Sequence, residues 1–126
     1  MLKKTICKRH ADVCKVFGNP LRIRIIEELV EQDRTTSELA EMLKVSQVNV
    51  SQALSMMRER NIVVSQRDGN IVHHSLADSR IRRVFYLMRE MLLDNLERSG
   101  ELAREARATL EPEQDADDKG IAILDT

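Results

Sequence analysis

The sequence predicts a mainly α-helical domain with one small β-hairpin. Its 126 residues suffice for one domain with a modest core plus appended segments. Leu, Ile, Val, Ala and Met supply most of the apolar content, while glycine and proline are few, which is typical of helical proteins. One Asp-Gly step lies between two β-leaning runs and indicates the hairpin near residue 69.

The first helix is predicted over residues 3–17, because apolar side chains recur there at helical spacing. Gly18-Asn19-Pro20 ends this helix, since glycine tolerates the left-handed cap and proline cannot continue the hydrogen-bond ladder. Pro20 then suits the first turn of a second helix, over residues 20–32. The apolar residues at helical spacing in the first helix are Leu2, Ile6, Val13 and Phe17. The residues of the second helix that are predicted to face inward are Leu21, Ile25, Ile26 and Leu29.

A short third helix is predicted over residues 37–43, with Thr36 or Ser37 as its N-cap and Glu38 in its first turn. Lys44-Val45 forms a turn into a fourth helix. This part of the chain is therefore expected to fold as two short helices joined by a tight turn.

The fourth helix begins after its N-cap, Ser46, and closes at Asn61. Its exposed face carries amides and hydroxyls where a solvated helix usually carries Glu and Lys. Such an uncharged face suits a helix that hydrogen-bonds base edges in a major groove. The residues of this face are Gln47, Asn49, Ser51, Gln52 and Ser55. The expected core anchors of the helix are Val48, Val50, Leu54 and Met57.

Residues 62–67 and 71–76 are predicted as the two strands of the hairpin, with Asp68-Gly69-Asn70 between them. A long last helix is predicted over residues 79–109, with Gly100 interrupting or ending it. Its apolar stripe is too wide for so small a domain to cover, which indicates a partner helix, most simply from a second copy. The stripe consists of Ile81, Val84, Phe85, Leu87, Met88, Met91, Leu92 and Leu96.

The net charge of −1 hides an uneven distribution. Residues 1–100 carry 17 lysines and arginines against 13 acidic residues, whereas residues 101–126 carry 3 against 8. Residues 44–89 carry 8 against 3, a local excess that can meet phosphate. The chain is therefore predicted to form a folded domain over residues 1–109 and an acidic flexible tail over residues 110–126.

Localisation and catalysis can also be judged from the sequence. No apolar run approaches the ~18 residues of a membrane span, and the N-terminus lacks the apolar stretch of a signal peptide. We therefore expect a cytoplasmic protein without a membrane partner. The sequence contains no phosphate loop, nucleophile elbow or paired-carboxylate pattern, so an enzyme is not expected.

Three segments together resemble the ArsR/SmtB family of winged helix-turn-helix repressors: FGNPLRIRIIEEL, SELAEMLKVSQVNVSQAL and IVVSQRDGNIVHHSL. The resemblance spans roughly residues 11–98. It implies four helices, two strands and a final helix, with a homodimer formed through the first and last helices. It also implies double-stranded operator DNA as the partner and release by a small inducer or thiol modification. The alternative is a winged-helix protein-interaction module without specific DNA binding.

The resemblance places the fourth helix in the major groove and the hairpin, as a wing, against the DNA. Asn and Gln can pair bidentately with adenine, and Arg67, with His73 or His74 nearby, would address phosphate or the minor groove. Arg58 and Arg60 are further candidate phosphate contacts. Any one of these polar residues could instead be an ordinary solvated side chain. The candidate DNA-binding residues are Ser46, Gln47, Asn49, Ser51, Gln52, Ser55, Arg67 and His73.

The metal-binding positions of the family are not filled in this sequence. Where family sensors place two cysteines on the third helix, this chain has Thr35 and Ser37. The last helix contains Asp78 but no histidine, so the family's other metal site is not expected either.

Cys7, His10 and Cys14 share one face of the first predicted helix, at i, i+3 and i+7. The two cysteines lie ~10 Å apart along the helix, beyond the ~7 Å limit for a disulfide. Three uses remain open: a thiophilic metal or metalloid site completed by a second subunit, thiol oxidation between subunits, and haem ligation. Otherwise Cys14 packs as a small hydrophobic residue and His10 is a surface residue. No cofactor is expected to be bound constitutively.

Overall fold

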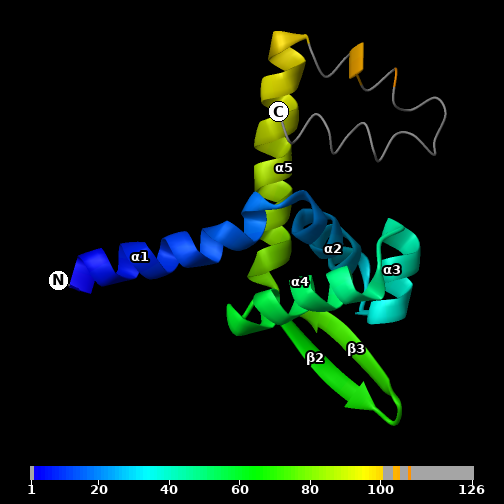
Figure 1. The fold of residues 1–126 in the computed structure, drawn as a ribbon. Helices are drawn as coiled ribbons and strands as arrows, with labels where there is room; N and C mark the ends of the chain where they lie inside the picture. The colour runs from blue at the N-terminus through cyan, green and yellow to red at the C-terminus, as the bar shows by residue number, and fades with distance from the viewer. Residues whose placement is uncertain (1, 101–103, 106–107, 109–126) are drawn as a thin grey trace. The chain divides into compact units, whose positions relative to one another are not determined.

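The computed structural model describes residues 2–100, 104, 105 and 108. The chain forms two compact units, Met1–Arg82 and Arg83–Thr126. In order, the elements of the first unit are α1 (Leu2–Cys14), the 3-10 helix η1 (Lys15–Gly18), α2 (Pro20–Glu31), β1 (Arg34–Thr35), α3 (Thr36–Leu43), α4 (Gln47–Glu59), β2 (Val63–Asp68) and β3 (Ile71–Leu76) (Figure 1). The last helix, α5 (Arg80–Ser99), begins in the first unit and continues into the second. The predicted mainly helical fold with a β-hairpin is confirmed.

The junction between α1 and α2 is tighter than predicted. Instead of one helix through residue 17, α1 ends at Cys14 and the chain continues as η1. Arg22 holds this turn, because its Nε and Nη2 donate to the carbonyl oxygens of Val16 and Lys15 at 3.0 and 2.8 Å. The Asn19 side chain caps α2 by accepting from the Arg22 backbone N–H at 3.1 Å. Val16 is thereby buried beside the start of α2.

A third strand, β1, was not predicted from the sequence. It pairs antiparallel with β3, giving the sheet order β1-β3-β2 in the described part of the chain. Arg34 lies opposite His74, and Thr35 lies opposite His73. A two-residue strand has no periodicity of its own, so only its pairing with a distant segment defines it.

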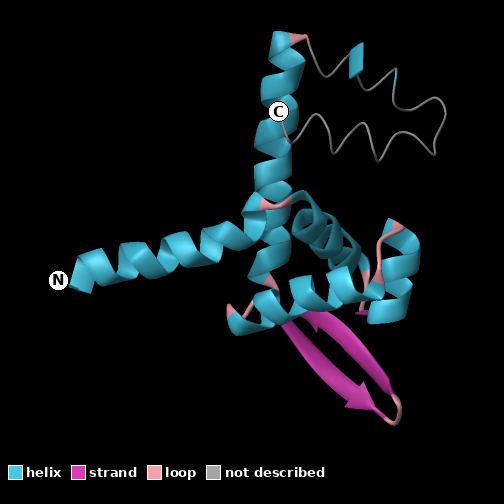
Figure 2. Cartoon of the chain, in the orientation of Figure 1, coloured by secondary structure: helices cyan, strands magenta, loops and turns pink. Residues whose placement is uncertain are grey.

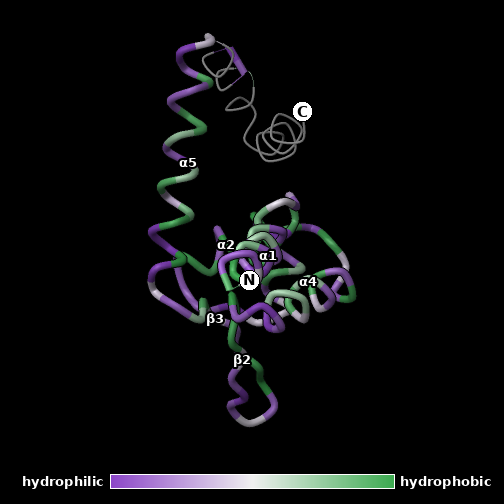
Figure 3. Tube along the Cα trace, turned by 90° about the vertical axis from the view of Figure 1, so that its left-hand side faces the viewer, coloured by the Kyte–Doolittle hydropathy of each residue, from purple (hydrophilic) through white to green (hydrophobic). Residues whose placement is uncertain are grey.

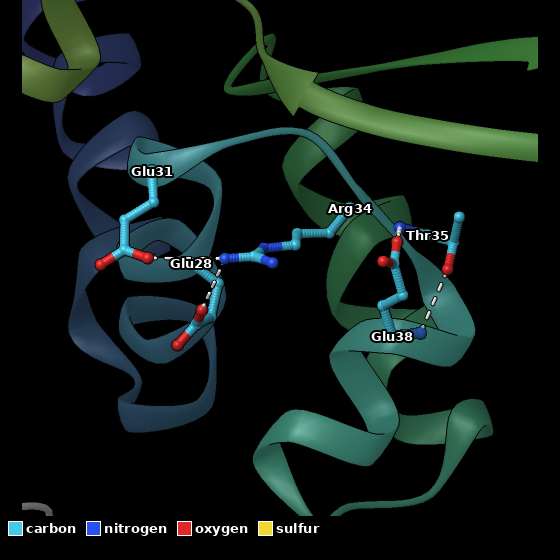
Figure 4. Close-up of polar contacts among 5 residues, drawn as sticks. All are labelled: Glu28, Glu31, Arg34, Thr35 and Glu38. Carbon is cyan, nitrogen blue, oxygen red and sulfur yellow. Dashed lines mark hydrogen bonds and ion pairs between the residues drawn. The ribbon is translucent and has the colours of Figure 1, made fainter.

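The N-cap of α3 is Thr35, one residue before the predicted Thr36 or Ser37. Its hydroxyl accepts from the Glu38 backbone N–H at 3.1 Å, and the Glu38 carboxylate accepts from the Thr35 backbone N–H at 2.8 Å (Figure 4). This reciprocal pair is a capping box. The predicted cap was therefore wrong by one residue, and β1 and α3 meet at a single threonine.

The core of the first unit lies among α2, α3, α4 and the base of the hairpin. On α4, Val50, Ala53, Leu54 and Met57 are buried at i, i+3, i+4 and i+7, which forms one helical stripe. Val48 was predicted to belong to this core but is 64% exposed. It lies about 200° around the helix from Val50, on the opposite face. The other buried core residues of the packed elements are Ile25, Ile26, Leu29, Val30, Leu39, Ala40, Leu43, Ile62 and Val63.

The strands β2 and β3 with their turn form a hairpin, called the wing below, that extends beyond α4 (Figure 2). The first strand is shifted by one residue from the prediction, to Val63–Asp68, so that Asp68 pairs with Ile71. A two-residue turn, Gly69-Asn70, therefore joins the strands. Gly69 has φ +66° and Asn70 does not have a positive φ, the pattern of a type II′ turn with glycine first.

The helix α5 ends at Ser99, and Gly100 follows with φ +77°. Most of the rest of the predicted helix over residues 79–109, and the predicted tail over residues 110–126, lies outside the described residues. Apolar and polar residues alternate along α5 (Figure 3). Several apolar residues of the predicted stripe are exposed in the single chain: Val84, Leu87, Met88 and Met91. Among the described residues, no helix has both the length and the apolar character that a membrane crossing requires.

Candidate nucleic-acid interface

The outward face of α4 carries the predicted uncharged polar side chains. All five of them are exposed in the structure: Gln47, Asn49, Ser51, Gln52 and Ser55. At ~100° per residue, Gln52 lies near the centre of this face, opposite the buried stripe. Val48 lies beside Gln52 at the same centre and is also exposed.

Val48 is thus a candidate contact residue that the sequence interpretation missed. An apolar side chain was assigned to the core because of its hydrophobicity alone. The helical phase gives the opposite result, since Val48 is out of register with Val50, Leu54 and Met57. In a major groove, a methyl-bearing side chain can contact the methyl group of thymine.

The start of α4 is fixed by Ser46. Its hydroxyl oxygen accepts from the Asn49 backbone N–H at 3.1 Å, so the predicted cap is confirmed. Lys44 precedes it in the left-handed region, with φ +57°, which makes the turn between α3 and α4 tight. The positive end of the α4 dipole is therefore presented next to Gln47, a suitable place for a phosphate.

The end of α4 is linked to the wing through Arg58. Its Nη2 donates to the Ser55 hydroxyl at 3.0 Å, and its Nη1 donates to the Ser65 hydroxyl at 3.1 Å. Ser55 is therefore held by a hydrogen bond and is not merely solvated. The Arg58 guanidinium therefore connects the outward polar face of α4, called the recognition face below, to strand β2.

The wing separates two residues that the sequence interpretation had grouped together. Arg67 lies opposite Val72, whereas His73 lies opposite Gln66. Directly paired residues share a face and successive residues alternate, so Arg67 and His73 point to opposite faces of the hairpin. Arg67 is exposed and His73 is half-buried.

His73 lies opposite Thr35, the residue at which β1 meets α3. The pKa of Glu38 is lowered mainly by its hydrogen bonds to Thr35, and further by the positive charges of Arg34 and His73. A contact between His73 and the same DNA segment as Arg67 is therefore not supported by the geometry of a single chain. His73 stays a candidate for a separate phosphate.

Not every arginine near the sheet is available for DNA. The Nη2 of Arg34 lies 3.3 Å from Glu28 Oε1 and 3.5 Å from Glu31 Oε2 (Figure 4). The Arg34 side chain is only 12% exposed. Its charge is thus neutralised by two carboxylates, and it fastens β1 to α2.

The candidate sensor residues Cys7, His10 and Cys14 are all exposed on α1. In the single chain Cys14 is not packed as a small hydrophobic residue, and His10 is a surface residue. Among the described residues, no group of three His, Cys, Asp or Glu side chains is arranged to hold a metal ion. Any site that uses these thiols must take further ligands from outside the single chain.

Comparison with known proteins adds a second line of evidence. The family model described as "Bacterial regulatory protein, arsR family" matches residues 19–65, from the start of α2 to the middle of β2. The uncharacterized HTH-type transcriptional regulator Rv0081 of Mycobacterium tuberculosis is 34% identical over 93 residues, which covers 73% of this chain and 82% of the relative. Its crystal structure gives a TM-score of 0.71 over 75% of this chain and 95% of that chain.

The chain belongs to the ArsR family. The transcriptional repressor SmtB homolog of Synechocystis is a further relative, 32% identical over 62% of this chain and 59% of its own length. The homodimeric winged helix-turn-helix domain Mb0332 of Mycobacterium bovis has the same fold, with 22% identity and a TM-score of 0.72 over 76% of this chain and 89% of that chain. As an ArsR-family protein, the chain is a winged helix-turn-helix transcriptional regulator and not an enzyme, as the sequence predicted.

Proposed function

We propose that this ArsR-family regulator is a homodimeric repressor that binds a specific operator through α4 and the wing. The observation that carries the proposal is the outward face of α4 from Gln47 to Ser55, where exposed amide and hydroxyl side chains surround Val48 and Gln52. The carboxylate on this side of the helix, Glu59, comes only at its last residue. Amide and hydroxyl side chains can hydrogen-bond base edges and so distinguish base pairs. A helix that only faces solvent has no need of such a face and usually carries Glu and Lys. The basic excess of residues 44–89 supports phosphate contacts around this face.

The direct test is binding to duplex DNA from the protein's own promoter. Fluorescence anisotropy at near-physiological salt compares that duplex with a shuffled duplex of equal length and composition. We expect at least ~10³-fold preference for the promoter duplex, the usual lower bound for specific binding. Equal affinity for the two duplexes would remove the repressor proposal and favour the protein-interaction alternative.

A substitution within the face tests the assignment of base contacts. Gln52→Ala should cost roughly 1–3 kcal/mol at one base position and relax selectivity there. Asn49→Ala is the matched variant at the edge of the same face. An unchanged base preference in both variants would remove these residues from the interface while leaving DNA binding itself intact.

The proposed dimer uses α1 and α5. Along α1, Leu2, Ile6 and Val13 are exposed by 75, 56 and 37%. Exposed apolar residues on α1 and α5 indicate a surface that another molecule covers. A second copy of the chain is the simplest such partner, because most soluble oligomers are symmetric homo-oligomers. The homodimeric state of the similar Mb0332 domain supports this arrangement. Two α4 helices would then contact two half-sites of one operator.

For the signal, we propose that Cys7 and Cys14, with His10, form the responsive site. Their exposure makes the thiols reachable by a metal, a metalloid, haem or an oxidant. Titration of the protein–DNA complex with zinc, arsenite, haem and a thiol oxidant should show release by at least one of them. Cys7→Ser and Cys14→Ser should keep DNA affinity but lose that release. A double variant that is still released normally would exclude both thiols.

A further inference from the structure

A continuous chain of hydrogen bonds runs from the start of α3 through the wing to α4. Thr36 Oγ1 lies 2.9 Å from His74 Nε2, and His74 Nδ1 lies 2.6 Å from Ser65 Oγ. Ser65 Oγ accepts from Arg58 Nη1 at 3.1 Å, and Ser55 Oγ accepts from Arg58 Nη2 at 3.0 Å. Elements α3, β3, β2 and α4 thus meet through these five side chains.

The guanidinium sets the direction of the first bond in this chain. Arginine only donates, so Ser65 Oγ accepts from Arg58, and its own hydroxyl hydrogen is free to donate to His74 Nδ1. With His74 neutral and Nδ1 as its acceptor nitrogen, Nε2–H donates to Thr36. This tautomer is assigned from the hydrogen-bond pattern. In this arrangement His74 fixes both the hydroxyl of Ser65 and, through it, the place of Arg58.

The surroundings of His74 favour the neutral form. His74 is 3% exposed. Within the described part of the chain, it is the one polar or charged residue that is buried. Burial lowers its pKa below the ordinary value, and the positive charges of Arg58 and His73 lower it further. Arg34, which lies opposite His74 on β1, forms ion pairs with carboxylates of α2. On α3, the Glu38 carboxylate is hydrogen-bonded in its capping box.

Arg58 differs from Arg34 in what holds it. Arg34 is held by two carboxylates, whereas the described hydrogen-bond partners of Arg58 are two uncharged hydroxyls. Arg58 is exposed and uses two of its five N–H groups in these bonds, so three donors and the full charge remain for an anion. Its place between the recognition face and the wing is where a backbone phosphate would pass.

We infer that His74 and Ser65 are positioning residues that hold the Arg58 guanidinium on the DNA-facing side, where it contacts a phosphate. Thr36 completes the support by fixing the far side of the imidazole. This inference rests on the proposed DNA binding. It assigns a role to the buried histidine of the wing, which lies behind the interface and touches no DNA itself.

The test is a double-mutant cycle on operator affinity across a series of salt concentrations. Arg58→Ala removes one charge-assisted contact in each subunit and should weaken operator binding by the dimer about a hundredfold, tenfold for each contact. It should also reduce the slope of log affinity against log salt by about 1.8, 0.9 for each subunit. Ser65→Ala should lower affinity in the same direction, and the double variant should be no weaker than Arg58→Ala alone. Independent effects that multiply in the double variant would overturn the inference.

Three further arms separate positioning from simple folding. Ser65→Thr, which keeps the hydroxyl, should retain affinity, and Gln66→Ala, at the neighbouring position on the opposite face of the wing, should be silent. Nitrogen-15 NMR of the imidazole should report the Nε2–H tautomer of His74 in the wild type. As the pH falls below the ordinary pKa of histidine, protonation turns Nδ1 into a donor and adds a positive charge beside Arg58. The Ser65 hydroxyl must then turn its hydrogen away from His74, so wild-type affinity should drop toward that of Ser65→Ala.

The outcomes also distinguish this inference from the proposed function. If the wild type binds its operator selectively and Ser65→Ala binds as well as the wild type at every pH, the positioning role is wrong and the repressor stands. If the wild type shows no selective binding to any duplex, the proposed function fails first.

Discussion

Helices α4 and α1 have the same length, 13 residues, but opposite relations to the rest of the chain. Four residues of α4 are buried, whereas none of the thirteen described residues of α1 is buried. In α4 the buried stripe fixes which face points outward, and that face is polar and uncharged. In α1 the apolar residues themselves point outward.

This difference shows what each helix needs. The fold alone determines the orientation of α4, so its outer face can be preorganised for a ligand such as DNA. Nothing in the described single chain covers Leu2 or Ile6 of α1, so this helix requires another surface. The same regulator thus contains one helix that is packed within the single chain, α4, and one helix whose apolar face is covered only when a second copy binds, α1.

The largest expected effect comes from the buried side of α4. Leu54→Ala removes a side chain with 0% exposure and should lower the free energy of unfolding by about 2–5 kcal/mol. Val48→Ala on the opposite side of the same helix should change it by less than about 0.5 kcal/mol. Urea denaturation followed by circular dichroism measures both. Similar losses in the two variants would contradict the assignment of the faces of α4.

The next effect concerns assembly through α1. If Ile6 is covered by a second copy, Ile6→Ser should lose about 1.5–3 kcal/mol of apolar burial in each subunit, a rise of at least about a hundredfold in the dimer dissociation constant. Lys4→Ser, on the same helix, is the matched control and should leave that constant nearly unchanged. Analytical ultracentrifugation reports the constant directly. A dimer that is insensitive to Ile6→Ser would place the subunit contact elsewhere.

A smaller effect is expected at the start of α4. Ser46→Ala removes the hydroxyl that accepts the Asn49 N–H and should lower stability by about 1 kcal/mol. Ser51→Ala, inside the helix, should leave stability unchanged or slightly higher because alanine is the better helix former. Thermal unfolding separates the two, while DNA affinity should fall in both variants. Equal stability of the two variants would mean that the cap contributes nothing.

The smallest expected effect is at Val48. If its methyl groups contact a thymine methyl, Val48→Ala should reduce the preference for that base pair by about 1 kcal/mol or less. Competition between operators that carry thymine or uracil at each position measures the loss, since uracil lacks the methyl group. A variant that discriminates thymine from uracil as well as the wild type does would remove Val48 from the interface.

The sequence predicted the features that depend on local chemistry. The Ser46 cap, the polar face of α4 and the hairpin around Gly69 each follow from a few neighbouring residues. Among the features that were missed, strand β1 depends on a distant segment, because it exists only through its pairing with β3. The cap at Thr35 is local, since Thr35 and Glu38 have the Thr-x-x-Glu spacing of a capping box, and the prediction overlooked that pattern.

Two side chains within the site show two different limits. Hydrophobicity alone placed Val48 in the core, although the phase of its own helix, set by Val50 and Leu54, would have moved it to the surface. His74 was predicted, as an alternative to His73, to lie near Arg67 at the phosphate or the minor groove, whereas the structure buries it. His74 lies on β3, and its hydrogen-bond partners Thr36 and Ser65 lie on α3 and β2. No local sequence pattern predicts contacts among three separate elements.

The most direct test of the contrast between α4 and α1 is selection from a randomised duplex library. The wild type, Gln52→Ala in α4 and Cys7→Ser in α1 are each selected at near-physiological salt and sequenced. We expect the wild type and Cys7→Ser to enrich the same inverted repeat, with half-sites about 10 base pairs apart or a multiple of that spacing. Gln52→Ala should lose selectivity at one position of each half-site. The account would be contradicted by a library without enrichment, or by the same motif in all three proteins.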